Sequence, residues 1–407
     1  MVSNKAVSRI KGWWPMLQAV SSKGKRVTLA LLPQSQINQL KQAKISFFCP
    51  VCKSRVIIKA GTQMIAHFAH QSLQDCPNRA GGEGVYHERG KLDLFAWLSQ
   101  LGFNVKLEYY LPEIKQRTDL MIQFVRKRLA IEYQCATISL KEILSRTRGY
   151  QSIGITPLWI LGGNRMRRLG KQGLYLTPTE QSYLHQFNND PYAKLYFYCP
   201  DTKQFARYDL SCFTGRNRSI GRLKFYPLAS IGFEQFFKTE HASIFTPEWL
   251  TEKKRFRLKL PNKMNQTERQ YREWLYLNQL FPSLISSWIG LPVNGQWTMN
   301  VSVWTWQTYL CYDFLNHFSH FTFKQLNLYM QRYRKQSTHN FPMLCQQVDP
   351  VADYLAYFLQ AGKIIKVGDT YRLRGTISQY QSLDAALEND QLIQLSLKRK
   401  VLLPIKN

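Results

Sequence analysis

The sequence predicts a multidomain protein of mixed α/β class, and three features of the chain support this prediction. Closely spaced cysteines and histidines lie among short strand patterns at residues 49–76. A succession of strand, strand, helix and strand at residues 105–163 is typical of an α/β core. From residue 266 onward the pattern becomes helical and aromatic. The chain has 407 residues, which is long enough for two to four domains with buried cores.

The chain is strongly basic, with 55 Lys and Arg against 26 Asp and Glu and a formal net charge of +29. Such an excess favours a polyanionic partner, chiefly nucleic acid. A generally basic soluble protein, or one attracted to anionic membranes, is the alternative. No apolar run reaches the length of a membrane span. Because Lys5, Arg9 and Lys11 interrupt any signal-peptide core, we expect a cytoplasmic protein. Its eight cysteines are too few for a disulfide scaffold.

The N-terminal region is predicted to be a β domain that ends in a metal-binding motif. Strand patterns occupy residues 26–32 and 55–59, and a polar helix is expected at residues 34–44. Structural zinc supplies folding free energy directly, so we expect a metal bound in this region to stabilise it.

The metal-binding motif has the spacing C-x2-C-x14-H-x2-H-x5-C. A Cys-x-x-Cys pair in a tight turn supplies one half of a tetrahedral zinc site, and a second pair at the far end of a hairpin closes it. Five candidates compete for four positions, so one of them is expected to stand outside the coordination sphere. Nothing in the motif suggests an open position, so we predict a structural zinc. The five candidates are Cys49, Cys52, His67, His70 and Cys76.

A helix is predicted at residues 81–102, where one row of polar residues shares a face. Glu83, His87 and Lys91 are spaced i, i+4 and i+8. The usual interpretation of such a row is a solvated helix edge. The functional interpretation is that Glu83 approaches a metal while His87 and Lys91 reach a phosphate. Gly90 costs ~1 kcal/mol relative to Ala and weakens the helix prediction at that point.

The next strands carry the acidic residues around which the core is predicted to be organised. After a strand at residues 105–111, two strands joined by a basic turn are expected at residues 119–134. Asp119 begins the first strand, and Glu132 and Gln134 share one face of the second. An Asp and a Glu on neighbouring strands can converge on a hard cation such as Mg²⁺. Solvated strand ends are the alternative.

A helix at residues 139–150 and a buried strand at residues 157–161 complete the expected core. Several motifs then occur together: Cys49-Pro-x-Cys52, His67-Phe-Ala-His70, Glu83-x3-His87-x3-Lys91, Arg117-x-Asp119, Ile131-Glu-x-Gln134 and Trp159-Ile-Leu. By these motifs, residues 46–163 resemble the competence protein CoiA family. That family is associated with natural transformation and with processing of incoming single-stranded DNA during recombination.

The middle domain of this family resembles the PD-(D/E)xK nuclease fold, and the resemblance implies roles for particular residues. Asp119 and Glu132 match the acidic ligands of a catalytic Mg²⁺ or Mn²⁺. Gln134 stands where many such nucleases carry a catalytic lysine. Another cation must then take that role, with Lys91 and Lys141 as candidates, or the domain binds DNA without cutting it.

The C-terminal part of the chain is predicted to be basic and mostly helical. Residues 251–263 look like a basic linker. Helix periods occur at residues 323–333 and 349–360, and a hairpin is expected at residues 363–373. Two helices and a hairpin suggest a winged helix, although the same succession occurs in protein-docking modules.

Together these patterns predict four regions. They are a zinc-ribbon-like β domain at residues 1–80, a nuclease-like α/β core at 81–165, a connecting α/β region at 166–250, and a helical domain at 251–407. We expect a DNA-binding, Mg²⁺- or Mn²⁺-dependent deoxyribonuclease acting on single-stranded or branched DNA in transformation and homologous recombination. The alternative is a catalytically inactive nuclease-fold adapter that binds single-stranded DNA and recruits a recombinase. The two alternatives share every structural expectation except the catalytic cation.

Overall fold

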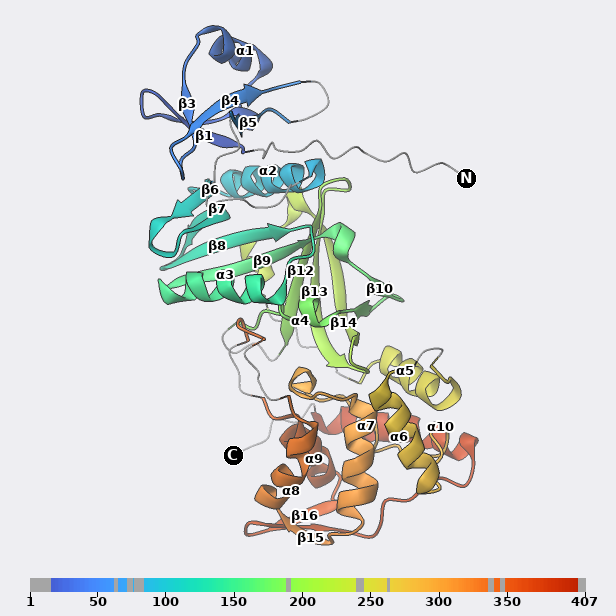
Figure 1. Ribbon diagram of the computed structural model, residues 1–407. Helices are drawn as coiled ribbons and strands as arrows, with labels where there is room; N and C mark the ends of the chain where they lie inside the picture. The colour runs from blue at the N-terminus through green and yellow to red at the C-terminus, as the bar shows by residue number, and fades with distance from the viewer. Residues whose placement is uncertain are drawn as a thin grey trace. The chain divides into compact units, whose positions relative to one another are not determined.

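A computed structural model describes residues 16–61, 65–71, 76, 84–187, 192–238, 245–261, 264–335, 340–344 and 348–401, with residues 398–401 described by backbone alone. The chain divides into two compact units (Figure 1). The first unit comprises Met1–Arg165, Tyr196–Ala206 and Phe225–Phe236. The second comprises Met166–Leu195, Arg207–Lys224 and Phe237–Asn407.

The first unit begins with a five-stranded antiparallel sheet in the order β2-β1-β3-β4-β5. The predicted strand at 26–32 is wrong beyond Thr28, because Leu29–Leu31 turn into a 3₁₀ helix that buries Leu29. The helix predicted at 34–44 is confirmed as α1, and Phe47, Val56 and Phe68 pack beneath it. The elements are β1 Gln18–Ser21, β2 Arg26–Thr28, α1 Gln34–Gln42, β3 Phe47–Phe48, β4 Arg55–Lys59 and β5 His67–His70.

The α/β core of the first unit follows the predicted succession. Strands β6, β7 and β8 are antiparallel, whereas β9 lies parallel to β8, with Glu132 opposite Trp159. Helix α2 packs on one face of the sheet at Tyr133, and α3 packs on the other at Glu132 and Trp159. The elements are α2 Val85–Gln100, β6 Lys106–Leu111, β7 Gln116–Phe124, β8 Lys127–Gln134, α3 Leu140–Ser152 and β9 Ile155–Gly162.

These core strands belong to a nine-stranded sheet of order β10-β11-β14-β13-β12-β9-β8-β7-β6. Strand β12 lies parallel to β9, with Phe197 opposite Leu161, so three neighbouring strands run in the same direction. The added elements are β10 Arg168–Leu169, β11 Gly173–Tyr175, α4 Pro178–Gln181, β12 Ala193–Cys199, β13 Gln204–Phe213 and β14 Arg218–Pro227. The chain is therefore a mixed α/β multidomain protein.

The C-terminal part of the second unit is mostly helical and has an aromatic core that includes Trp249, Trp306, Tyr354 and Phe358. A small sheet of order β15-β17-β16 lies beside α8 and α9 (Figure 1). The elements are α5 Pro247–Leu258, α6 Gln266–Leu277, α7 Val303–Thr308, β15 His320–Thr322, α8 Phe323–Met330, α9 Pro350–Gln360, β16 Ile364–Val367, β17 Thr370–Leu373 and α10 Leu383–Val401.

The prediction of a basic linker at residues 251–263 is wrong for residues 251–258, because helix α5 continues to Leu258. Thr246 caps the helix, and its hydroxyl accepts a hydrogen bond from the Trp249 amide. Two of its basic residues point inward, where Arg257 Nε donates to Asp390 Oδ2 at 2.7 Å and Lys253 Nζ lies 3.1 Å from Oδ1. The run of charge resembled a solvated linker because its buried acidic partner lies more than 130 positions away in the sequence.

Candidate metal and nuclease-like site

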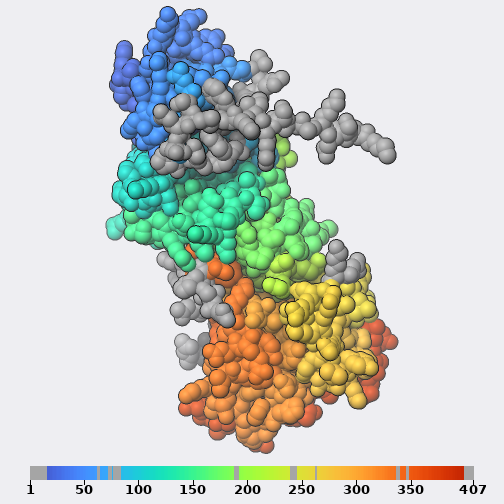
Figure 2. Space-filling model, in the orientation of Figure 1, coloured from blue at the N-terminus to red at the C-terminus, as the bar shows by residue number. Residues whose placement is uncertain are grey.

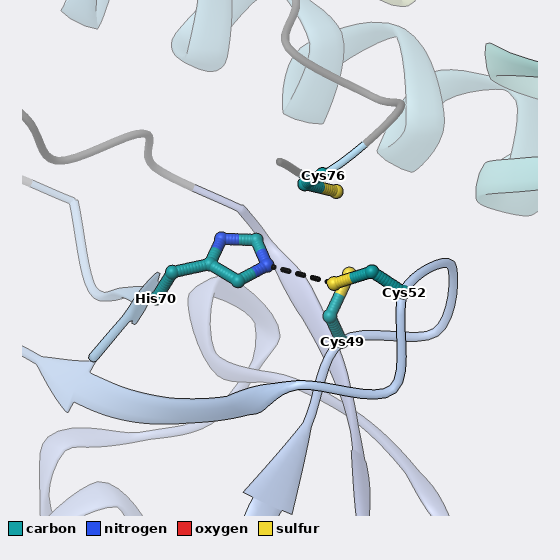
Figure 3. A group of neighbouring side chains, drawn as sticks. All are labelled: Cys49, Cys52, His70 and Cys76. Atoms are coloured by element: carbon teal, nitrogen blue, oxygen red, sulfur yellow. Dashed lines mark hydrogen bonds between the residues drawn. The ribbon is translucent and has the colours of Figure 1, made fainter. Parts of the chain in front are cut away.

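The predicted metal motif forms a compact cluster in the first unit (Figure 3). One ligand atom each from Cys49, Cys52, His70 and Cys76 lies within 4.8 Å of all the others. His67 is the fifth candidate, and it stands outside the cluster with Nδ1 2.9 Å from the Ile65 carbonyl. Three thiols and one imidazole are the donor set of a structural zinc site, so the residues fit that ion.

The local fold explains how the four ligands meet. Cys49 and Cys52 occupy a tight turn after β3, in which Lys53 adopts a positive φ of 62° and its amide donates to the Cys49 carbonyl. His70 ends β5, where it lies opposite Val56 of the neighbouring strand. This arrangement brings His70 Nε2 to 3.3 Å from the Cys52 sulfur. The Cys3His cluster could hold a metal ion such as zinc.

A second group of polar residues is buried where β7 and β8 stop pairing in regular register. The last register pair is Leu120 with Ile131, so Asp119 lies one residue beyond it, inside β7 rather than at its start. Asp119 is 8% exposed, and its Oδ2 accepts a hydrogen bond of 2.9 Å from the Tyr133 amide. This bond holds the Asp119 carboxylate against the backbone of β8.

Helix α2 brings His87 and Lys91 to Asp119. His87 Nε2 lies 2.6 Å from the Tyr133 carbonyl, and because a carbonyl only accepts, Nε2 carries the proton. The same nitrogen lies 3.7 Å from Asp119 Oδ2. Lys91 is fully buried, and its Nζ lies 3.9 Å from Asp119 Oδ1. The predicted polar row on this helix therefore faces the sheet, although Glu83 lies outside the described residues.

The glycine that weakened the helix prediction explains this close approach. A Cβ on Gly90 would lie only 2.2 Å from Tyr133 Cε1. Only a residue without a side chain allows α2 to approach β8 so closely. The local cost of Gly90 in helix propensity is thus outweighed by the contact that holds His87 and Lys91 over the strands.

Two further acids, which the sequence patterns did not single out, surround Lys91. Its Nζ donates to Glu108 Oε1 at 2.8 Å and lies 3.4 Å from Glu88 Oε1. Glu108 sits opposite Asp119 at an irregular point of β6, with a positive φ of 47°. Its other oxygen accepts from the Leu17 amide at 3.2 Å and lies 3.5 Å from Arg117 Nη1. Glu108 therefore links the N-terminal strands to the Asp119 site.

Glu132 of β8 is held by helix α3. Arg146 Nη2 donates to its Oε1 at 2.5 Å, and the Tyr150 hydroxyl donates to the same oxygen. Burial raises the pKa of Glu132 to about 7, with Arg146 lowering it and the charge of Asp119 raising it. The second oxygen of Glu132 accepts no hydrogen bond from the residues that the structure describes. The charge of Asp119 is one of the causes that raise the pKa of Glu132, so the two acids influence each other electrostatically.

The Gln134 amide nitrogen donates to the Ala136 carbonyl at 2.9 Å, and among the described residues Gln134 forms no hydrogen bond with Asp119 or Glu132. Lys141, the other candidate cation, lies exposed in the first turn of α3. Of the two lysines considered from the sequence, only Lys91 is within 4.0 Å of a carboxylate of this group. Lys91 is therefore the cation that the fold brings to Asp119.

The fold and these two sites define a multidomain α/β protein with a Cys3His cluster and a buried centre of carboxylates and cations on its sheet. Three family models match the chain in succession: the N-terminal domain of competence protein CoiA at residues 29–79, its nuclease-like domain at 83–241 and its C-terminal domain at 244–387. The chain belongs to the competence protein CoiA family.

A curated relative agrees with the family models. Competence protein CoiA of Bacillus subtilis (strain 168) is 32% identical over 283 residues, which cover 69% of this chain and 74% of the relative. No solved structure matches the chain. Among the described residues, no helix is both long enough and apolar enough to cross a membrane. Membership of this family, together with the nuclease-like domain, fits a role in competence and transformation.

Proposed function

We propose that this chain is a metal-dependent deoxyribonuclease of the PD-(D/E)xK type, acting on single-stranded or branched DNA during natural transformation and recombination. The observation that supports this most is that two buried carboxylates, Asp119 and Glu132, lie on neighbouring strands, and that the buried Lys91 ammonium lies 3.9 Å from the first of them. The nuclease-like family model covers all of these residues. The net charge of +29 favours DNA as the substrate.

The donor set suits a hard divalent cation. Asp119 and Glu132 would hold Mg²⁺ or Mn²⁺, since such ions prefer carboxylate oxygens and accept few protein ligands. Glu132 Oε2 is the oxygen left for an ion, because Arg146 and Tyr150 both bond to Oε1. When bound, the ion would lower the pKa of a water molecule and stabilise charge on the phosphate.

Lys91 is proposed to supply the positive charge that Gln134 cannot. A neutral amide can orient water but adds no charge, and the Gln134 amide bonds to Ala136. Lys91 Nζ lies near Asp119 and comes from helix α2. The lysine of α2 would therefore replace the catalytic lysine that many such nucleases carry at the position of Gln134 on β8. His87 bonds to the Tyr133 carbonyl and so holds α2 in register with the strand that bears Glu132. Glu88 and Glu108 hold the Lys91 ammonium in place.

The other domains are proposed to support this core. Zinc in the Cys3His cluster would stabilise a zinc-ribbon-like domain at residues 1–80. Because the Leu17 amide donates a hydrogen bond to Glu108, this domain would also help to position the Glu108 carboxylate. A connecting region at residues 166–250 and a C-terminal domain at 251–407 follow the nuclease-like core at 81–165. Helices α8 and α9 with strands β15, β16 and β17 are compatible with a winged helix.

Cleavage of DNA by the purified chain with Mg²⁺ or Mn²⁺ tests the proposal. Wild type should convert labelled single-stranded or branched DNA to shorter products only when the ion is added. Asp119→Asn and Glu132→Gln should abolish cleavage while DNA binding stays intact or tightens, because each removes a charge that the ion needs and that repels phosphate. Gln134→Ala should have a smaller effect. The matched control is Asp201→Asn, which neutralises a carboxylate in a largely exposed ion pair with Arg89.

Cleavage by Asp119→Asn at the wild-type rate would exclude the mechanism. Two observations favour a second candidate function, a non-catalytic adapter that binds single-stranded DNA and recruits a recombinase. Glu132 is already neutralised by Arg146, and position 134 has no lysine. The adapter predicts no ion-dependent cleavage by wild type, and only modest effects of all three substitutions on DNA binding.

A further inference from the structure

A basic groove lies in the second unit, and none of the residues discussed above for catalysis lines it. It has a volume of about 250 Å³ and lies between α5, the beginnings of α6 and α7, and the turn that joins β13 to β14. The segment that holds α5 and α6 is coloured yellow in Figure 2 and reaches the molecular surface on the face shown. The charged residues that line the groove are Arg216, Arg218, Arg255, Lys259, Arg272 and Glu268.

The cations of this groove exceed the acids that could neutralise them. Arg218 and Arg255 share one carboxylate, Glu252, at 2.7 and 2.8 Å. Arg272 is paired with Glu268 at 2.8 Å. The side chains of Arg216 and Lys259 are exposed and form no ion pair or hydrogen bond with any residue that the structure describes. The groove thus presents a surplus of positive charge to solvent.

An apolar hollow of about 580 Å³ adjoins the basic groove, and Arg272 lines both. Tyr276, one helical turn after Arg272 on α6, is 81% exposed, and Phe281 is 56% exposed. Leu260 and Leu277 complete the exposed apolar surface, each at 72%. Contiguous exposed apolar patches on soluble proteins often mark sites of interaction. Aromatic faces and surplus cations therefore lie side by side.

We propose that this combined surface binds single-stranded nucleic acid, independently of cleavage at Asp119. Phosphates would lie against Arg216, Lys259 and Arg272, and bases would stack on Tyr276 and Phe281. Proteins that bind single strands without sequence preference combine a basic groove with aromatic stacking platforms in this way. A duplex offers the phosphates but keeps its bases stacked inside, so the exposed rings favour a single strand.

An acidic polypeptide is the rival occupant, because it also would be attracted to the cations. Its carboxylates would pair with the cations but would not stack on the two exposed aromatic rings beside them. Base stacking uses the rings, and phosphates use the cations, so one single strand satisfies both halves of the surface. The two occupants are separated by the experiment.

The experiment measures binding of fluorescein-labelled oligothymidylate to the full chain by fluorescence anisotropy, without added divalent ion. Tyr276→Ala and Phe281→Ala should each weaken binding by about 5-fold to 100-fold, the usual loss for one stacked base. Tyr276→Phe keeps the ring and should bind like wild type. Phe225→Ala removes a half-exposed ring of the first unit and is the matched control.

The phosphate contacts are tested by the salt dependence. Arg216→Gln with Lys259→Gln should lower the slope of log affinity against log salt by about 1.4, since each phosphate contact to a single strand contributes about 0.7. Lys23→Gln with Lys25→Gln changes the same charge at exposed sites of the first unit and should leave the slope unchanged. Unchanged circular dichroism and melting would show that each variant is folded.

Three results would overturn the proposal. They are a loss of less than 2-fold in both alanine variants, equal affinity for single-stranded and duplex DNA, and competition by polyglutamate as strong as competition by unlabelled oligothymidylate. The last result would assign the surface to an acidic protein. Because no divalent ion is present, failure of the nuclease proposal leaves all three readouts unaffected.

Discussion

Replacing Lys91 by methionine tests the buried centre of the nuclease-like core. Lys91 is fully buried, and its ammonium lies 2.8 Å from Glu108, 3.4 Å from Glu88 and 3.9 Å from Asp119. Lys91→Met keeps the length of the side chain but removes the charge, which leaves three acids without their shared cation. Breaking a buried ion pair by removing one partner costs about 3–5 kcal/mol. We expect a loss of that size in the stability of the first unit.

Native-state hydrogen exchange measured by mass spectrometry reads this loss on the full chain. Peptides from α2 and β6–β8 report the local free energy of opening, so the second unit does not obscure the signal. Lys203→Met is the matched control, because Lys203 pairs with Asp93 but its side chain is 58% exposed. An exposed ion pair contributes about 0–1 kcal/mol. Equal effects of the two substitutions would refute the assignment of Lys91 as a buried counter-ion.

A double variant separates the structural role of Lys91 from its proposed catalytic role. Lys91→Met with Glu108→Gln removes a cation and an acid together, so much of the lost stability should return. Ion-dependent DNA cleavage should remain absent, because the positive charge proposed to act beside Asp119 is still missing. Cleavage at the wild-type rate by either variant would show that Lys91 does not supply that charge.

Three further predictions follow from the burial of particular residues. Cys49→Ser with Cys52→Ser should give insoluble protein or an unfolded N-terminal domain, because the metal supplies folding free energy. Elemental analysis of wild type purified without added metal should find one zinc per chain. Absence of zinc would contradict the assignment of the cluster as a metal site. Gly90→Ala should weaken cleavage and the protection of α2 from hydrogen exchange. The added Cβ would lie 2.2 Å from Tyr133 Cε1, so the helix must move until these two atoms are more than 3.0 Å apart. Unchanged protection of α2 would contradict this packing. Burial lowers the pKa of His185 to about 3, so the unfolded state alone binds its proton as the pH falls from 6.5 toward 3, and stability present above pH 6.5 is lost. Urea denaturation at pH 7 and pH 5 should show that lowering the pH costs His185→Gln about 2 kcal/mol less stability than it costs wild type. An equal change in the two proteins would refute the role of His185.

Local patterns were sufficient to predict the elements whose determinants lie close together in sequence. The strand at residues 55–59 and the hairpin formed by β16 and β17 were predicted from short alternating runs, and both are confirmed. The metal motif was predicted from its spacing, but spacing alone could not exclude His67. The structure excludes it because consecutive residues of a strand point to opposite faces, so positions 67 and 70 cannot both face one centre.

The residues that sequence patterns missed depend on contacts between distant segments. Glu108 lies among apolar residues of β6 and has no local motif, and its importance appears only where Lys91 and Leu17 meet it. Arg146 looked like one of several basic residues on a helix, whereas the fold pairs it, partly buried, with Glu132. The only available signal was composition: a Glu inside an apolar strand requires a buried partner.

The most direct test of the account is the location of Mn²⁺ in crystals of the full chain. The anomalous scattering of manganese identifies the ion without reference to its ligands. The account predicts one peak between the carboxylates of Asp119 and Glu132 in wild type, and no peak there in Asp119→Asn. A wild-type crystal soaked in Mn²⁺ with no peak at these carboxylates, and with Arg146 still bound to Glu132, would contradict it.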